Sequence, residues 1–134
     1  QALVMRPGHF DVLVMENFLG DMLSELGGGT IGGVGLCPSG NVGDHHAYFE
    51  PIHGSAPDIA GQDKANPTSQ VLTLALMLDH LGEHAAGDAI RSAVSRALES
   101  GAVELNELGQ PKAGTRAAAA AIAAAVTDAQ PAGA

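Results

Sequence analysis

The sequence has no tryptophan, a single tyrosine, Tyr48, and a single cysteine, Cys37. One cysteine excludes an internal disulfide and is typical of a reducing compartment, so we expect a cytoplasmic location. No residue near Cys37 in the sequence would serve as a base that activates its thiol, and we predict a small buried apolar residue there. The shortage of aromatic side chains leaves little for recognition by base stacking.

Basic residues and long apolar runs are also scarce. The sequence contains six Lys and Arg residues and 15 Asp and Glu residues, which gives a net charge of −9. This argues against nucleic acid as a partner, because phosphates require a basic surface. No run approaches the roughly 20 apolar residues of a membrane helix, so we expect no membrane partner. The first six residues contain too short an apolar run for a signal peptide and lack an initiator Met, so we expect a piece of a longer protein.

The composition is that of a folded chain. Its 134 residues are 46% hydrophobic, with a mean hydropathy of +0.13. This is enough for one domain with a core. Because neither an internal repeat nor a linker divides the sequence, we treat residues 1–134 as a single truncated unit.

Strand-like and helical patterns alternate in the first half of the chain. Phe10–Met15 is short, apolar and rich in β-branched residues, and predicts a buried strand. Asp21–Leu26 predicts a short helix that Gly27–Gly29 would end. Ile31–Asn41 is interrupted by glycines, as in a strand that another backbone or a ligand approaches, and Ala47–Glu50 is a second short strand. Strand, loop and helix in this order favour an α/β fold.

The second half of the sequence is helical. About Asn66–His80 predicts a helix with an asparagine cap followed by proline, apolar on nearly all sides and therefore buried in the core or in a subunit interface. About Glu83–Ser100 is amphipathic. Thr115 is the expected cap of an alanine-rich helix that runs to about Val126, and the tail from Asp128 is expected to fray.

The loop Glu50–Gly61 concentrates proline, glycine, one histidine and two carboxylates in twelve residues. Proline fixes φ and glycine allows close approach, so such loops often hold ligands. His53 suits either a ligand contact or a hydrogen bond within the loop. Asp58 could accept hydrogen bonds from the two hydroxyls of a ribose, and its charge would then repel a 2′-phosphate. It could equally cap a turn. A G-x-G-x-x-G motif is absent, so a dinucleotide site here would not be of the Rossmann kind.

Two acidic or histidine-bearing stretches raise the question of a metal. Asp21 and Glu25 are four residues apart on the predicted helix and share one face, which suits Mg²⁺ or Mn²⁺ but equally a solvated surface. Asp44, His45 and His46 are adjacent in the sequence and converge poorly on one ion, so we favour an exposed loop there.

Two stretches resemble the isocitrate/isopropylmalate dehydrogenase family of metal-dependent, decarboxylating enzymes. Phe49–Gly61, with Ala65-Asn66-Pro67, resembles its cofactor loop, and Phe10-Asp11-Val12 with Asn17 and Gly20–Glu25 resembles its metal-binding segment. The resemblance spans about residues 1–126 and implies a partial α/β fold of this family, with strands and flanking helices. About residues 1–30 would form the metal-carboxylate segment, and about 31–127 the NAD-binding loop and C-terminal helices.

The resemblance also implies roles for individual residues. Asp21 would be a ligand of Mg²⁺ or Mn²⁺, and Glu25 stands beside it where the family usually has Asp. Asn66 would approach the adenine, and the dipeptide Asp58-Ile59 resembles the NAD-using version of the loop. The residues expected to line the NAD pocket are Glu50, His53, Gly54, Ser55, Ala56, Asp58 and Ile59.

The implied reaction is the NAD-dependent oxidation and decarboxylation of a 2-hydroxy acid such as isocitrate, homoisocitrate or 3-isopropylmalate. The segment Ile31–Asp44 favours the isocitrate and homoisocitrate types. The family's catalytic residues are expected upstream of Gln1, so we expect none in this chain and no activity from it alone. The full-length parent is expected to be a homodimer or larger. The alternative is a non-catalytic NAD-binding or interaction module.

Overall fold

The computed structural model describes residues 1–128, so the predicted frayed tail lies almost entirely outside the described residues. Helices dominate, and a single two-stranded sheet appears among these residues. The elements in chain order are α1 (Ala2–Met5), η1 (Pro7–His9), α2 (Asn17–Thr30), η2 (Val34–Leu36), β1 (Pro38–Val42), β2 (Ala47–Pro51), η3 (Pro57–Ile59), α3 (Thr68–His80), α4 (His84–Glu99) and α5 (Thr115–Asp128).

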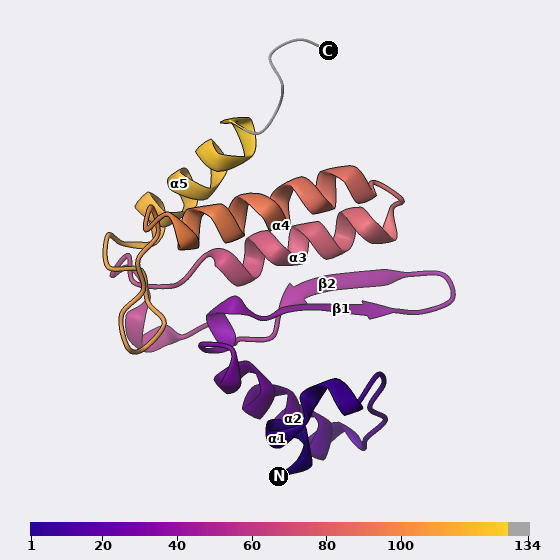
Figure 1. Cartoon of the computed structure of the whole chain (residues 1–134). Coiled ribbons are helices and arrows are strands. Elements are labelled where there is room, and N and C mark those ends of the chain that lie inside the picture. Colours follow the sequence, from indigo (N-terminus) through magenta and orange to yellow (C-terminus); the bar gives the residue numbers. More distant parts are fainter. Residues whose placement is uncertain (129–134) are drawn as a thin grey trace.

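The larger part of the molecule is layered. Helices α3 and α4 lie side by side, α3 covers the hairpin of β1 and β2, and α5 packs on α4 from the opposite side (Figure 1). Apolar side chains of α4 and α5 meet in the core, together with a residue from the connection between them. The buried members of this core are Val94, Ala97, Val103, Ala118 and Ile122.

The two strands form an antiparallel hairpin that confirms the strand predicted at Ala47–Glu50, lengthened by one residue. Gly40 stands opposite Phe49 in the register. A Cβ at Gly40 would lie 2.9 Å from the Phe49 ring, so only glycine leaves room for this aromatic side chain. The Phe49 ring in turn lies 5.5 Å from that of His80, centroid to centroid, which joins the hairpin to the end of α3.

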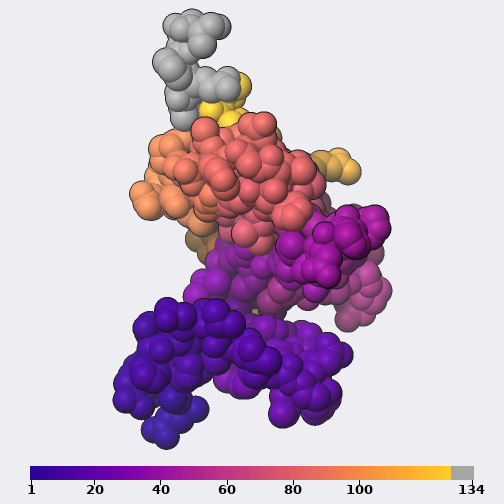
Figure 2. All heavy atoms as spheres, turned by 90° about the vertical axis from the view of Figure 1, so that its right-hand side faces the viewer, coloured from indigo at the N-terminus to yellow at the C-terminus, as the bar shows by residue number. Residues whose placement is uncertain are grey.

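The strand predicted at Phe10–Met15 is wrong. These residues run without regular structure, and Val14 is 92% exposed. A strand is stable only where a neighbour completes its hydrogen bonds, and no strand among residues 1–128 pairs with this segment. Figure 2 shows that the N-terminal residues, in indigo, form a lobe at the lower end of the molecule, away from the α3–α4 layer.

Helix α2 is longer than the predicted Asp21–Leu26 and passes through all three glycines that were expected to end it. Its start is capped by the Glu16 carboxylate, which accepts hydrogen bonds from the backbone N–H groups of Phe18 at 3.1 Å and Leu19 at 3.4 Å. The positive φ angles that stop a helix occur later, at Gly32 and Gly33. Glycine composition alone therefore misplaced the end of the helix.

The predicted start of α3 is confirmed. Asn66 accepts a hydrogen bond from the Thr68 N–H at 3.0 Å, as a capping asparagine does, and Pro67 already has helical dihedral angles. Helix α3 is not buried on all sides within this chain, because Leu74 is 42% exposed; the other expected arrangement, burial in a subunit interface, stays a prediction. Three of its four buried residues are polar, and one of them, Ser69, donates its hydroxyl hydrogen to the Cys37 carbonyl oxygen. Cys37 itself is buried as predicted, and burial raises the pKa of its thiol.

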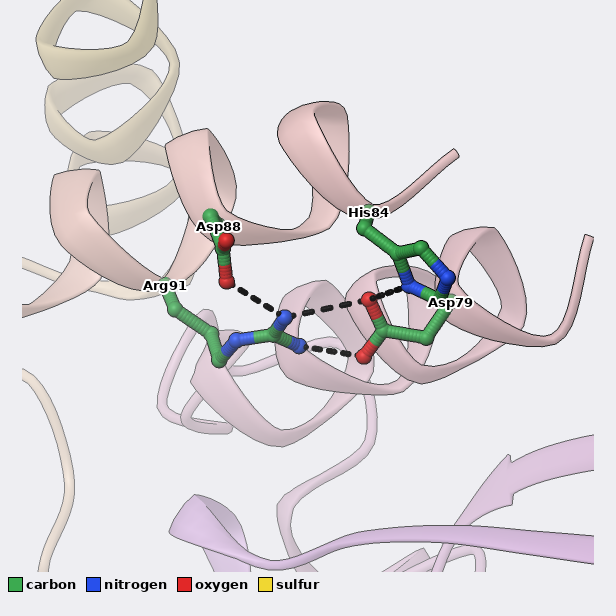
Figure 3. A network of polar contacts seen from close by, with 4 residues as sticks. All are labelled: Asp79, His84, Asp88 and Arg91. Carbon is green, nitrogen blue, oxygen red and sulfur yellow. Dashed lines mark hydrogen bonds and ion pairs between the residues drawn. The ribbon is translucent and has the colours of Figure 1, made fainter. Parts of the chain in front are cut away.

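A polar network joins α3 to α4 (Figure 3). Arg91 of α4 donates to Asp79 of α3 at 2.8 and 3.1 Å and to Asp88 at 2.8 Å, and His84 Nδ1 lies 3.5 Å from Asp79. The bond from Arg91, followed by that from His84, holds the pKa of Asp79 below its ordinary value. Gly87 permits the close approach, since a Cβ there would lie 2.6 Å from the Asp79 carboxylate.

Candidate functional site

A pocket of about 490 Å³ lies where the cofactor-like loop meets the glycine-rich segment before β1. Its walls come from parts of the chain that are far apart in the sequence. The lining residues are Glu25, Gly32, Gly33, Val34, Gly35, His53, Gly54, Ser55, Ala56, Ile59, Ala65, Asn66, Leu108, Gly109 and Gln110.

Most of the predicted cofactor residues line this pocket: His53, Gly54, Ser55, Ala56, Ile59 and Asn66. Glu50 and Asp58 are not among its lining residues. Glu50 lies on β2 and accepts a hydrogen bond from the Tyr48 hydroxyl at 2.7 Å, which raises the pKa of Tyr48. Asp58 is exposed in η3, between Ala56 and Ile59, so it stands beside the pocket rather than in its wall.

The loop His53–Ala56 has a fixed and partly strained backbone. The Nδ1 atom of His53 lies 3.0 Å from the carbonyl oxygen of Gly54, which satisfies the predicted hydrogen bond within the loop. A ring that carries its proton on Nδ1 leaves Nε2 as an acceptor for a ligand, so the two predicted roles are compatible. Ala56 has φ +44°, a left-handed conformation that is unfavourable for alanine and that occurs often at ligand sites.

Glycines occupy two positions where the walls of the pocket come into close contact. A Cβ on Gly35 would lie 2.9 Å from the Cβ of Asn66, and a Cβ on Gly109 would lie 2.9 Å from the carbonyl oxygen of Gly32. The close backbone approach predicted for the segment from Ile31 to Asn41 is therefore confirmed, although Val34–Leu36 forms a 3₁₀ turn and not a strand.

The turn Leu108–Gln110 is the part of the site that the sequence did not predict. Asn106 shapes it by accepting hydrogen bonds from the N–H groups of Leu108 at 2.9 Å and Gln110 at 3.0 Å. An asparagine three residues before a glycine is a turn signal, and it could have indicated a turn here. It could not have indicated which other loop the turn touches.

The segment that leads from the loop into α3 is tied to the start of α5. The Asp63 carbonyl and carboxylate oxygens accept from the N–H groups of Thr115 at 3.0 Å and Arg116 at 3.1 Å. The expected cap, Thr115, instead donates its hydroxyl hydrogen to the carbonyl of Ala65 at 2.6 Å. Thus Asp63, distant in the sequence, caps α5, and α5 in turn holds the pocket segment Ala65–Asn66.

Only one of the two predicted metal ligands lies at the pocket. Glu25 lines the pocket, whereas Asp21 is exposed on α2 outside it, with its carbonyl accepting from the Ser24 hydroxyl. Residues 1–128 contain no group of three or more His, Cys, Asp or Glu side chains that could hold a metal ion. Two carboxylates are few for Mg²⁺ or Mn²⁺, so further ligands would be water, substrate or groups outside these residues.

One other sequence expectation concerns the surface of the hairpin. The stretch Asp44-His45-His46 forms the exposed turn between β1 and β2, as predicted. Among the described helices, none is long and apolar enough to cross a bilayer.

Comparison with known proteins first indicates a class. The chain is 59% identical over 99 residues to an isocitrate/homoisocitrate dehydrogenase of Thermus thermophilus and 50% identical over 99 residues to a 3-isopropylmalate/3-methylmalate dehydrogenase of Methanocaldococcus jannaschii. Each match covers 74% of this chain and 30% of the relative, so the chain spans about a third of their length. The relatives are thus dehydrogenases.

The structure and the family comparison are more specific. The fold matches the crystal structure of isocitrate dehydrogenase from Methylococcus capsulatus with a TM-score of 0.84 and 43% identity, over 93% of this chain and 37% of that one. The sequence model for isocitrate/isopropylmalate dehydrogenase matches residues 1–128. The chain therefore belongs to the isocitrate/isopropylmalate dehydrogenase family.

Proposed function

We propose that the chain forms the adenosine side of an NAD site in an enzyme that oxidises and decarboxylates a 2-hydroxy acid. The observation that carries this proposal is the pocket of about 490 Å³, because the loop that resembles the family's cofactor loop forms one of its walls. The residues His53–Ala56 and Asn66 border the space, and they offer polar groups to a ligand rich in hydroxyl and phosphate groups.

We propose NAD and not NADP as the cofactor because of the negative charge that Asp58 gives the loop. Asp58 is exposed between two residues that line the pocket, Ala56 and Ile59. A carboxylate at this rim accepts hydrogen bonds from the two hydroxyls of the adenosine ribose and repels a 2′-phosphate. Asp58→Asn keeps the shape and one acceptor oxygen but removes the repulsion, so it should narrow the preference for NAD.

Mg²⁺ or Mn²⁺ is proposed as the second cofactor, with Asp21 as a ligand and Glu25 beside it. A metal held by these carboxylates would supply a Lewis acid beside the substrate's oxygens. The 2-hydroxy acid itself is proposed to be isocitrate or homoisocitrate before 3-isopropylmalate, from the likeness of the segment Ile31–Asp44. Catalytic groups are not assigned to this chain, so residues 1–134 alone should bind NAD without turning substrate over.

A non-catalytic NAD-binding or interaction module is the second candidate. The observation that favours it is that most of the cofactor-loop residues line the pocket, whereas Asp21, the proposed metal ligand, is exposed outside it. The two proposals differ in activity and not in cofactor binding. NADH production from isocitrate by the parent protein supports the enzyme, and NAD binding without turnover by that same parent supports the module.

The pocket is tested by calorimetric titration of this chain with NAD⁺ and NADP⁺, with and without Mg²⁺. Gly54→Ala is the test variant, because its Cβ meets no atom within 4 Å and would occupy ligand space. Gly8→Ala is the matched control, since Gly8 also has open space around it but lies outside the pocket. We expect only Gly54→Ala to weaken NAD⁺ binding. Equal binding by both variants would contradict the placement of the cofactor, and absence of binding by the wild type would contradict the proposed function.

We also propose that the parent is a cytoplasmic homodimer or larger, with α2 against a second copy. Phe18, Met22 and Leu26 recur every four residues on α2, and Met22 is 56% exposed. Contiguous apolar surface of this kind marks an interface. Light scattering should show a concentration-dependent dimer that Met22→Glu dissociates. A wild-type chain that stays monomeric at high concentration would contradict this arrangement for the present chain.

A further inference from the structure

Asn66 stands where the three loop walls of the pocket meet. Its Cβ is packed against Gly35, where an added Cβ would approach to 2.9 Å. Its own neighbour in the chain, Ala65, lines the pocket beside the cofactor loop. Its Nδ2 atom donates a hydrogen bond of 2.9 Å to the carbonyl of Gly109, in the turn that forms the remaining wall.

Both ends of the Asn66 amide are engaged inside the protein. The oxygen caps α3 by accepting from the Thr68 N–H at 3.0 Å, while the nitrogen donates to Gly109. The side chain is half-buried. Its amide is therefore oriented by two backbone partners before any ligand arrives, and only its second N–H and the second lone pair of its oxygen remain for a ligand.

The turn that Asn66 holds is otherwise self-contained. Within residues 1–128, the other hydrogen bonds of Asn106–Gln110 stay inside this turn: Asn106 accepts from Leu108, Gly109 and Gln110, and exchanges further bonds with Gln110. Among these hydrogen bonds, the one from Asn66 is the one that reaches another pocket wall; the turn also touches the Gly32 backbone, but by packing at Gly109. Leu108, which lines the pocket, is 79% exposed, so packing of its own side chain does little to fix the turn in place.

We propose that Asn66 is a positioning residue, whose amide holds the turn Leu108–Gln110 against the pocket as its third wall and thereby sets the affinity for the adenosine half of the dinucleotide. This inference rests on the proposed function and deepens it. The ligand then meets the exposed side chain of Leu108 and the backbone of Gly109 in a fixed place, so less ordering is required on binding. The side chain of Asn66 acts through the turn and not on the base itself.

Asn66→Asp separates the two bonds of the amide. The aspartate keeps an oxygen that caps α3, and Asp is as good a cap as Asn. It cannot donate to the Gly109 carbonyl, and it places a negative charge against that oxygen. Asn66→Ser is the uncharged second variant, because serine also caps a helix but is too short to bridge to Gly109. Asn41→Asp is the control for the same chemical change at an exposed position on β1.

The experiment combines two measurements on the full 134-residue chain. The first is the ¹⁵N amide spectrum without ligand, and the second is calorimetric titration with ADP-ribose. We expect Asn66→Asp and Asn66→Ser to move the signals of Leu108, Gly109 and Gln110 and to lower ADP-ribose affinity about fivefold or more. Asn41→Asp should change neither the signals of Leu108–Gln110 nor the affinity for ADP-ribose.

The outcomes distinguish this inference from the function on which it rests. Weaker binding with unmoved turn signals would overturn the positioning role and favour a direct contact between Asn66 and the adenine. Moved turn signals with unchanged affinity would overturn the link between the turn and the ligand. A wild-type chain that binds neither ADP-ribose nor NAD⁺ would overturn the proposed function itself, and the role in affinity with it.

Discussion

Substitution of the three consecutive glycines of α2 by alanine, one at a time, is the sharpest test of this structure. The sequence pattern ended the helix at Gly27, whereas the structure continues it to Thr30. These two arrangements predict opposite signs for the change in helix stability when glycine is replaced by alanine. Glycine at a helix end with positive φ is better than alanine, but glycine inside a helix is worse than alanine by about 0.5–1 kcal/mol.

The surroundings of each glycine give the magnitude. A Cβ on Gly27 or on Gly29 would meet no atom within 4 Å, and neither residue has a positive φ. Each alanine should therefore stabilise α2 by about 0.5–1 kcal/mol. A Cβ on buried Gly28 would lie 3.0 Å from the Cys37 sulfur and 3.6 Å from Ile52 and Val34. Overpacking of this kind costs about 1–3 kcal/mol, so Gly28→Ala should be neutral or destabilising.

Native-state hydrogen exchange of the α2 amides is the suitable assay, because it reports the local opening free energy even where α2 unfolds separately from the core. Slower exchange in Gly27→Ala and Gly29→Ala, together with unchanged or faster exchange in Gly28→Ala, is the expected result. Faster exchange in all three variants would refute the continuous helix and restore the helix end that the sequence pattern indicated.

Three further predictions concern the packing that supports the pocket. Ile122→Ala should lower the free energy of unfolding in urea by about 2–5 kcal/mol and Ile122→Val by about 0.5–1.5, because the side chain is fully buried; equal effects would contradict that burial. Asp63→Ala should remove the cap of α5 and cost about 1 kcal/mol, whereas Asp63→Asn keeps an acceptor for Arg116 and should cost less; identical melting curves would contradict the cap. The pKa of Asp79 is held below its ordinary value by Arg91, so as the pH falls the unfolded chain takes up the proton first. The stabilisation is thus complete above the ordinary aspartate pKa of about 4 and is lost below it; a urea midpoint that falls as steeply in Asp79→Asn as in the wild type would contradict this.

Local signals in the sequence were sufficient for the C-terminal helices and for the second strand of the hairpin. The Asn66-Pro67 cap located the start of α3, and the amphipathic pattern located α4 to within a residue at each end. These features depend on neighbours in the chain, which is why the sequence contains them. The motif at Phe49–Gly61 likewise indicated the family, and the family comparison confirms it.

Local sequence patterns gave wrong predictions where the secondary structure depended on residues distant in the sequence. Phe10–Met15 has the composition of a strand, but it forms none because residues 1–128 supply no strand beside it. Gly28 is of a residue type that often ends a helix, but it lies within α2, where the lack of a side chain leaves room for the Cys37 side chain. Helix and strand propensities are weak beside such tertiary contacts.

The loop Glu50–Gly61 shows the division most clearly. Its proline and glycine content, and the side chains available to a ligand, were determined by the sequence alone. Only the tertiary structure decided what stands opposite the loop: Glu25 without Asp21, the glycines before β1, and the turn at Gly109 that Asn66 holds. The physical reason is that a turn or a cap is stabilised by residues a few positions away, whereas a pocket is formed by backbone segments that meet only after the helices and hairpin have packed.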